Sequence, residues 1–237
     1  GAAGMGYDEK QHHAGAMLCF DPNHGHRVPG FNYQGADKLG REFYEMCQKS
    51  NPDFLMVGEG CYDLQSQYYG TYTRADYWHE PVLRYIDPTV PIACAVIDHN
   101  DLNHVNMCLA DRYAMSYEVR NFKGHLGEFP RVMAYGRKVD NLRRRYADFL
   151  WNGEFLDVLG ATVKGDNIRY TVFRNLKNGK KAVVVYNVDT KKANTASVSI
   201  DGSSAPLVMA SPEKPAPAKF TGAVTLGPQS AVVIMEK

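Results

Sequence analysis

The chain has 237 residues, enough for one large domain or two of ordinary size, and 44% of them are hydrophobic, which allows a sizeable core. Its 27 basic and 26 acidic residues nearly balance, so the charge pattern argues against nucleic acid as a partner. The longest apolar runs, such as residues 182–186, are far too short to cross a bilayer, and no membrane partner is expected.

The first elements alternate strand, helix and strand. Residues 4–9 are typical of a strand that ends in two carboxylates, Asp8 and Glu9. A helix is predicted at 36–50, where Asn51-Pro52 stops a run of apolar residues at helical spacing, namely Leu39, Phe43, Met46 and Cys47. Residues 54–60 then form a predicted buried strand that ends in Glu59. This order favours parallel βα units.

The pattern continues less regularly toward the middle of the chain. Short apolar runs occupy 82–86, 103–114 and 115–118, and a long amphipathic helix is predicted at 131–151. The composition then changes near Asp157, from residues rich in Tyr, His, Asp and Cys to alternating apolar positions with small turn residues and Lys. We therefore expect two domains, 1–156 and 157–237.

The second domain has the pattern of an antiparallel β-sandwich. Residues 167–174 alternate, and Asn178-Gly179 is a hairpin turn leading into 182–187. Further strands are predicted at 196–200, 206–209, 223–226 and 231–235. The proline-rich stretch 212–217 is expected to be a surface loop. A supporting role is the main interpretation of this domain, with glycan binding as the alternative.

Acidic residues at strand ends are the first candidates for chemistry. In parallel sheets and barrels the loops after the carboxyl ends of the strands build the active site, and Asp8, Glu9 and Glu59 all occupy that position. Of two such carboxylates, one can act as the nucleophile or base and the other as a protonated acid. Asp8 and Glu9 cannot both point to one site from a regular strand. The alternative is that these acids cap helices or pair with arginine.

The polar loop 21–30 is a second candidate, because such loops commonly line pockets. His24 and His26, with His12-His13 upstream, could bind a metal, although substrate contacts or capping are the commoner roles. The segment 98–104 has the same ambiguity, and a helix cap at Asp101 or Asn103 is favoured there.

Other residue types carry weaker indications. The chain has no GxSxG, P-loop or GxGxxG motif, which disfavours serine-hydrolase and nucleotide chemistry. The five cysteines form an odd set without CxxC, so we expect free and mostly buried thiols, and Cys61 is interpreted as buried rather than as a nucleophile. An aromatic cluster after the second carboxylate could stack on sugars or pack in a core: Tyr68, Tyr69, Tyr72, Tyr77 and Trp78.

Several short motifs together carry a family resemblance. They are GYDE at 6–9, DPNHGHR at 21–27, GEG at 58–60, RYIDP at 84–88 and LGATV at 159–163. Their order resembles the later half of a glycoside-hydrolase-type (β/α)8 barrel. More narrowly, it is similar to an uncharacterised bacterial family of glycosidase-like barrel proteins with a C-terminal β-sandwich. The resemblance implies an α/β plus all-β fold, a partial TIM-type barrel followed by the sandwich, with the first three or so barrel strands outside the chain.

The resemblance also implies site roles and a carbohydrate substrate. Asp8 matches the position of a nucleophile and Glu59 that of the acid/base. In a retaining glycosidase the two carboxyl groups lie about 5–5.5 Å apart, and in an inverting one about 6.5–9.5 Å. Glu9, His24, Arg27 and Arg84 are expected to hydrogen-bond sugar hydroxyls, on the basis of loop position. No cofactor and no metal are expected.

Two other functions stay open at this point. A non-catalytic carbohydrate-binding or scaffold protein would keep the aromatic residues and need no carboxylate pair. A metal-dependent hydrolase would use His24 and His26 with Asp98. An incomplete barrel would expose strand edges and apolar surface, so we expect either a homo-oligomer or a separate chain that completes the barrel.

Overall fold

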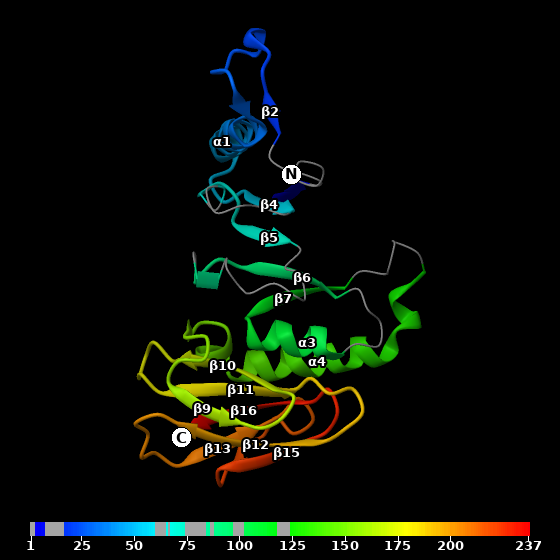
Figure 1. The fold of residues 1–237 in the computed structure, drawn as a ribbon, viewed down its shortest axis with the longest axis vertical. Helices are drawn as coiled ribbons and strands as arrows, with labels where there is room; N and C mark the ends of the chain where they lie inside the picture. The colour runs from blue at the N-terminus through cyan, green and yellow to red at the C-terminus, as the bar shows by residue number, and fades with distance from the viewer. Residues whose placement is uncertain are drawn as a thin grey trace. The chain divides into compact units, whose positions relative to one another are not determined.

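The structure is a computed structural model that describes residues 3–7, 17–59, 65, 67–73, 84–85, 88–96, 102–117 and 124–237. The chain divides into two compact units, residues 1–93 and 94–237. Figure 1 labels the helices and strands that follow.

Unit 1, residues 1–93, contains a parallel sheet with one long helix. Strand β1 (Gly4–Tyr7) pairs in parallel with β4 (Leu55–Glu59), and β4 pairs in parallel with β5 (Thr71–Thr73). Tyr72 of β5 pairs with Ile92, the first residue of β6 (Ile92–Val96). Helix α1 (Asn32–Ser50) lies in the chain between β1 and β4. The predicted parallel βα arrangement is thereby confirmed for β1, α1 and β4.

Helix α1 begins four residues before the predicted start and ends at Ser50 as predicted. The ring of Phe43 lies 6.4 Å from that of Tyr7, which places this side of α1 against β1. Leu39 and Met46, two of the apolar residues at helical spacing, are 51% and 55% exposed. Helical spacing identifies an apolar face but does not show whether another element covers it.

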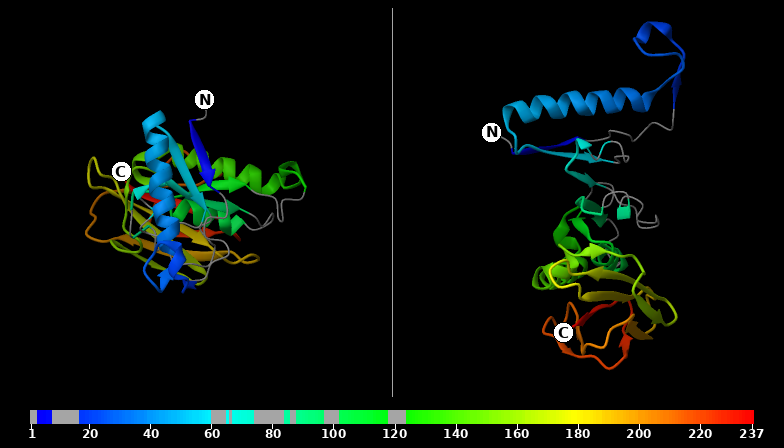
Figure 2. Two further views of the ribbon diagram at one scale, coloured as in Figure 1. Left: turned by 90° about the horizontal axis from the view of Figure 1, so that it is seen from above. Right: turned by 90° about the vertical axis from the view of Figure 1, so that its left-hand side faces the viewer.

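A β-hairpin precedes α1 directly, as Figure 2 shows. Its strands β2 (Leu18–Cys19) and β3 (Gly30–Phe31) are antiparallel, and the short 3-10 helix η1 (Pro22–His24) lies between them. The polar loop 21–30 is thus a structured connection.

Unit 2, residues 94–237, begins inside β6 and continues with helices and one further strand before the sandwich. They are α3 (Leu102–Ala110), β7 (Tyr113–Tyr117), η4 (Leu126–Glu128), α4 (Pro130–Arg145) and α5 (Ala147–Leu150). The apolar run 103–114 is therefore split, since Arg112 has a positive φ of 56° that ends the helical turn before β7. The single helix predicted at 131–151 is also split, at Tyr146.

The remainder of unit 2 is the predicted antiparallel sandwich. Its nine strands are β8 (Glu154–Phe155), β9 (Ala161–Lys164), β10 (Ile168–Arg174), β11 (Lys181–Asn187), β12 (Asn194–Ile200), β13 (Leu207–Ala210), β14 (Ala218–Lys219), β15 (Ala223–Leu226) and β16 (Ala231–Glu236). One sheet has the order β14-β13-β16-β11-β10-β8, and the other has the order β15-β12-β9. The proline-rich stretch 212–217 is a loop between β13 and β14, as predicted.

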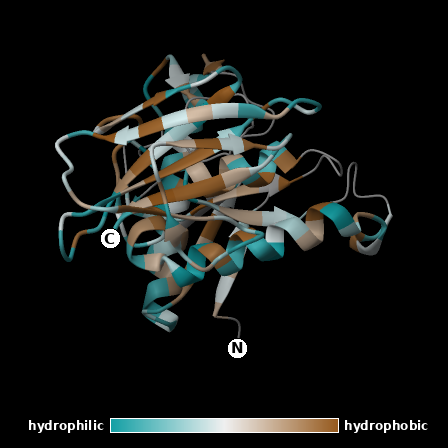
Figure 3. Cartoon of the chain, turned by 90° about the horizontal axis from the view of Figure 1, so that it is seen from below, coloured by the Kyte–Doolittle hydropathy of each residue, from teal (hydrophilic) through white to brown (hydrophobic). Residues whose placement is uncertain are grey.

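One apolar core joins the two sheets of the sandwich. Val172, Val183 and Ile234 from the larger sheet pack in the same cluster as Val198 and Leu226 from the smaller one. Figure 3 shows hydrophobic colouring along the central strands and hydrophilic colouring on many of the connecting loops.

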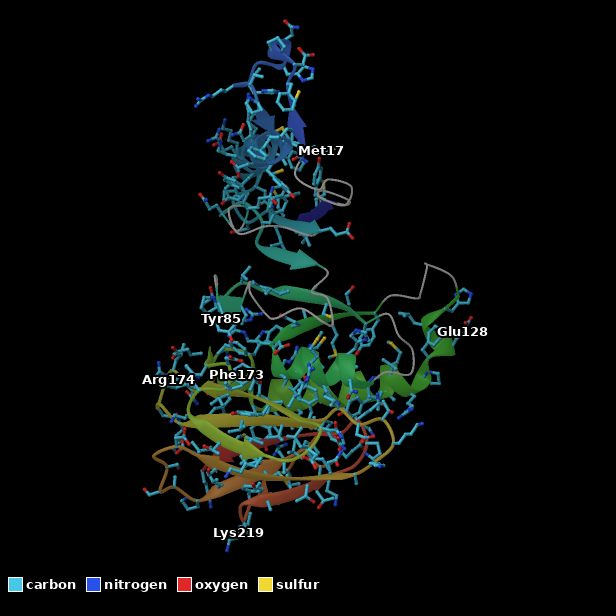
Figure 4. The ribbon with its side chains drawn as sticks, viewed as in Figure 1. Met17, Tyr85, Glu128, Phe173, Arg174 and Lys219 are labelled. Carbon is cyan, nitrogen blue, oxygen red and sulfur yellow. The ribbon has the colours of Figure 1, made fainter. Side chains whose placement is uncertain are left out.

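The side chains of β10 alternate between core and surface over only part of the strand. Phe173 is buried, and its ring centroid lies 5.7 Å from that of Phe155. Arg174, its neighbour, is exposed and pairs with Glu154. Figure 4 labels Phe173 and Arg174. The alternation predicted for 167–174 is absent at 171–173, where three consecutive residues are buried.

The helices of unit 2 are tied to the sandwich by buried polar groups. Asn106 Nδ2 of α3 donates to the carbonyl of Gln229 at 3.0 Å, and Thr171 Oγ1 of β10 donates to the carbonyl of Ala110 at 2.6 Å. Buried polar groups of this kind need their partners, so they fix the two layers to each other. The compact unit consequently starts near residue 94, whereas the composition changes near 157.

Two smaller expectations concern membranes and thiols. Among the described residues, no helix combines the length and apolarity required to span a bilayer. Four cysteines lie in the described part, and all four are free thiols; Cys94 and Cys108 are buried, and Cys19 and Cys47 are half-buried. Cys61 lies outside the described residues.

Candidate functional site

Glu59 is the last residue of β4, at the carboxyl end of a strand in a parallel sheet. Its side chain is only 9% exposed. Residues paired across parallel strands point to the same face, so Gly58 shares a face with Tyr7, whose ring lies against α1. Glu59 follows Gly58 and therefore points to the opposite face, away from α1. In barrels built from βα units, that is the interior face, at the end where active sites form.

Asp8 and Glu9, the other two predicted carboxylates, lie outside the described residues. The pairing of the strand residue before Asp8 is described. Tyr7 is paired with Gly58, and in the sequence Asp8 follows Tyr7 as Glu59 follows Gly58.

Arg84 is 1% exposed and binds backbone oxygens. Its Nη1 donates to the carbonyl of Val90 at 2.7 Å and to that of Pro88 at 3.2 Å. A guanidinium with several fixed donors can hold a turn in this way, and this turn directly precedes β6. A contact between Arg84 and a sugar stays a prediction.

His24 and Arg27 lie in the hairpin of unit 1, and both are exposed. His24 Nδ1 lies 3.1 Å from Cys19 Sγ, and its Nε2 lies 3.2 Å from Asp21 Oδ2. His26 completes this group, since ligand atoms of Cys19, His24 and His26 all lie within 4.8 Å of one another. Both histidines are candidates from the sequence, whereas the contribution of Cys19 is not predicted from it. The spacing Cys-x4-His-x-His was the available indication.

The other candidates from the sequence are the aromatic cluster and two aspartates, and the structure describes only some of them. Tyr69 is buried, and the ring of Tyr68 lies 6.0 Å from that of Tyr44 in α1, so packing against the unit accounts for both. Tyr77, Trp78, Asp98 and Asp101 lie outside the described residues.

Unit 2 contains a cavity of about 430 Å³ between α3, α4 and the sandwich. Its lining includes Tyr135, Met209, Leu226 and Val232 and is mostly apolar. Glu213 is the one acidic residue of this lining, and its carboxylate pairs with Lys138 at 2.6 Å. This cavity therefore does not offer the pair of carboxylates that glycosidic hydrolysis requires.

The buried thiols of unit 2 are suited to structure rather than to nucleophilic chemistry. A hydrogen bond with Cys94, together with burial, raises the pKa of Cys108 well above its ordinary value. A thiol attacks as its thiolate, so this environment disfavours reactivity. Arg143 lies nearby with its pKa lowered by burial, and its Nη2 donates to the carbonyl of Cys108 at 2.6 Å.

Comparison with known proteins identifies the fold. No protein-family model and no curated protein matches the sequence. Among solved structures, the chain is similar to a noncanonic maltogenic alpha-amylase from Thermotoga neapolitana, with 9% identity, a TM-score of 0.54, and coverage of 82% of this chain and 58% of that one. It is also similar to a cyclomaltodextrinase, with 13% identity, a TM-score of 0.54, and coverage of 84% and 43%.

A third similar structure is the cyclic alpha-maltosyl-(1→6)-maltose hydrolase from Arthrobacter globiformis, with 13% identity, a TM-score of 0.51, and coverage of 87% and 55%. These neighbours have the amylase-type architecture, a (β/α)8 barrel with a C-terminal β domain. The chain therefore has a glycosidase-like fold over most of its length, and it spans 43–58% of the three enzymes' lengths.

Proposed function

We propose that this chain belongs to a glycoside hydrolase in which Asp8 and Glu59 form the catalytic carboxylate pair. The observation that carries the proposal is the position of Glu59, buried at the carboxyl end of β4 on the face away from α1. The amylase-type fold supports it, because such barrels place catalytic carboxylates at the carboxyl ends of their strands. The proposal includes part of a (β/α)8 barrel followed by the sandwich.

The chemistry proposed is retaining hydrolysis. Asp8 attacks the anomeric carbon while Glu59 protonates the leaving oxygen, and water then releases the sugar with Glu59 acting as base. This requires the two carboxyl groups to lie about 5–5.5 Å apart. Glu9, Arg27, Arg84 and His24 are proposed to contact sugar hydroxyls.

The test uses the enzyme on maltooligosaccharides, because amylase and cyclomaltodextrinase are among the similar structures and because the leaving oxygen of these substrates needs protonation. Glu59→Gln and Asp8→Asn should each lower kcat/KM by about 10²–10⁴-fold. Glu45→Gln is the matched control, since Glu45 is an exposed residue of α1 in the same unit. Hydrolysis unchanged in both catalytic variants would overturn the proposal.

The same variants distinguish the alternatives. A protein that binds oligosaccharide, hydrolyses none, and keeps its affinity after Glu59→Gln is a carbohydrate-binding or scaffold protein. Nuclear magnetic resonance of the first-formed product shows whether the anomeric configuration is retained or inverted, which decides between the two carboxylate mechanisms.

A further inference from the structure

The hairpin of unit 1 gathers one thiol and two imidazoles from a short stretch of chain. Cys19 ends β2, His24 ends η1, and His26 follows after one intervening residue, Gly25. The ligand atoms of all three residues lie within 4.8 Å of one another. Cysteine and histidine are the two side chains that most often bind zinc-class metals.

The backbone of the hairpin places these three side chains. Asp21 Oδ1 accepts a hydrogen bond from the Asn23 amide at 2.8 Å and so starts η1, and Gly25 reverses the chain with a φ of 71°. The register pairs Cys19 with Gly30. A Cβ at Gly30 would lie only 2.5 Å from Nδ1 of His26, so the absence of a side chain there lets the His26 ring lie against the strand.

Hydrogen bonds around the two rings define which nitrogens carry lone pairs. His24 Nε2 faces the Asp21 carboxylate at 3.2 Å, so the neutral ring that satisfies this contact is protonated on Nε2 and directs the Nδ1 lone pair toward Cys19 Sγ. His26 Nδ1 donates to the carbonyl of Arg27 at 3.0 Å, which leaves Nε2 as its unprotonated atom. Metal-binding histidines are oriented in this way, with the other nitrogen held by a carboxylate or a backbone carbonyl.

We propose that Cys19, His24 and His26 bind one divalent transition-metal ion of the zinc class. The ligands would be Sγ of Cys19, Nδ1 of His24 and Nε2 of His26, with water in the fourth position. The thiol loses its proton to solvent as the metal–sulfur bond forms, and no electron is transferred. In a tetrahedral site, sulfur and nitrogen ligands lie about 3.5 Å apart, so Sγ and Nδ1, now 3.1 Å apart, separate by a few tenths of an ångström.

This inference does not depend on the proposed catalytic pair, but it removes one of the proposed sugar contacts. With Nδ1 on a metal and Nε2 on Asp21, the His24 ring has no atom left for a sugar hydroxyl. The metal-bound protein therefore leaves that contact to Arg27 and the other candidates.

The test uses the full chain freed of metal by chelation and titrated with Co²⁺, whose thiolate complexes have a charge-transfer band in the near ultraviolet. We expect one Co²⁺ per chain with this band, and Zn²⁺ should displace it. Cys19→Ser should abolish the band, whereas the matched control Cys47→Ser should keep it, because Cys47 is also a half-buried free thiol of unit 1. Asp21→Asn should weaken binding by about 10–100-fold, as the loss of an outer-sphere partner does.

A second measurement needs no variant. Zn²⁺ should protect Cys19 from alkylation while leaving the modification of Cys47 unchanged, as read by peptide mass spectrometry. The proposal is overturned if the Co²⁺ spectrum lacks the thiolate band, if Cys19→Ser retains it, or if Zn²⁺ gives Cys19 no protection.

Discussion

Tyr117, on β7, shows how a single residue links packing to pH. Burial raises its pKa to about 12, and its hydroxyl donates to Met115 Sδ at 3.4 Å. Cys108 in the same unit also has a raised pKa, because its thiol is hydrogen-bonded to the Cys94 thiol and because it is buried. Both groups are thus held neutral in the folded protein.

The sign of the pH effect follows from these raised values. A group whose pKa is higher in the folded than in the unfolded protein contributes its full stabilisation at pH values below the unfolded pKa. That stabilisation is lost as the pH rises through the folded pKa. For Tyr117 the ordinary value is 10.0 and the folded value is about 12, so unit 2 should lose stability between those pH values.

Thermal unfolding followed by circular dichroism should show a falling Tm across this range. Tyr117→Phe should reduce the fall, because the ring stays and the titrating hydroxyl is gone. A Tm that falls identically in the variant would mean that other groups account for the alkaline loss.

At the scale of elements, the contact between α4 and β7 depends on a glycine. Gly136 of α4 is buried, and a Cβ at this position would lie 1.7 Å from Tyr117 Oη. The hydroxyl end of the Tyr117 side chain therefore occupies the space that a side chain at position 136 would need.

Gly136→Ala should destabilise unit 2 by about 1–3 kcal/mol, since overpacking forces side chains and backbone to shift. Gly35→Ala in α1 is the matched control, because a Cβ there meets nothing within 4 Å. That change should be neutral or stabilising by up to about 1 kcal/mol. Urea unfolding measures both, and a Gly136→Ala variant as stable as the parent would contradict the close contact.

The connection between the helices and the sandwich is a second feature at this scale. Asn106 is fully buried, accepts from Tyr135 Oη at 2.6 Å and donates to the Gln229 carbonyl at 3.0 Å. Its two hydrogen bonds connect α3 with α4 and with the turn before β16.

Asn106→Leu removes both of these buried hydrogen bonds, at a cost of about 1–3 kcal/mol each. Urea unfolding should therefore show a large loss of stability in the transition of unit 2. Asn141→Leu on the exposed side of α4 is the control and should change little. If the sandwich unfolded independently of the helices, two transitions would appear and Asn106→Leu would move only one.

For the whole molecule, exposed apolar residues on unit 1 predict association. Leu39 and Met46 are exposed on α1, and so is Met5 on β1, the first strand in the order of its sheet. Apolar residues gathered on one element are typical of a surface that another chain covers.

We expect light scattering of the purified chain to give a mass above the 26.5 kDa of one chain, as association of two or more copies would. Leu39→Glu with Met46→Glu should lower this mass. A stable monomer at micromolar concentration would contradict the prediction.

Elements with local patterns were predictable from the sequence. Alternating residues located β10, short apolar runs located β11 and β16, the Asn-Gly turn located the hairpin between β10 and β11, and the apolar run ending in Glu59 located β4. These features were predictable because propensity, turn chemistry and alternation act between near neighbours.

Only the tertiary structure decided how those elements combine. Arg84 is held by backbone carbonyls, Asn106 ties α3 to the sandwich, and Cys19 joins the two histidines because β2 pairs with β3. Each depends on which groups meet after the chain has folded, and the pattern around a single residue does not contain that information. For the same reason the sequence could name Glu59 as an acid at a strand end, whereas its burial on the face away from α1 came from packing.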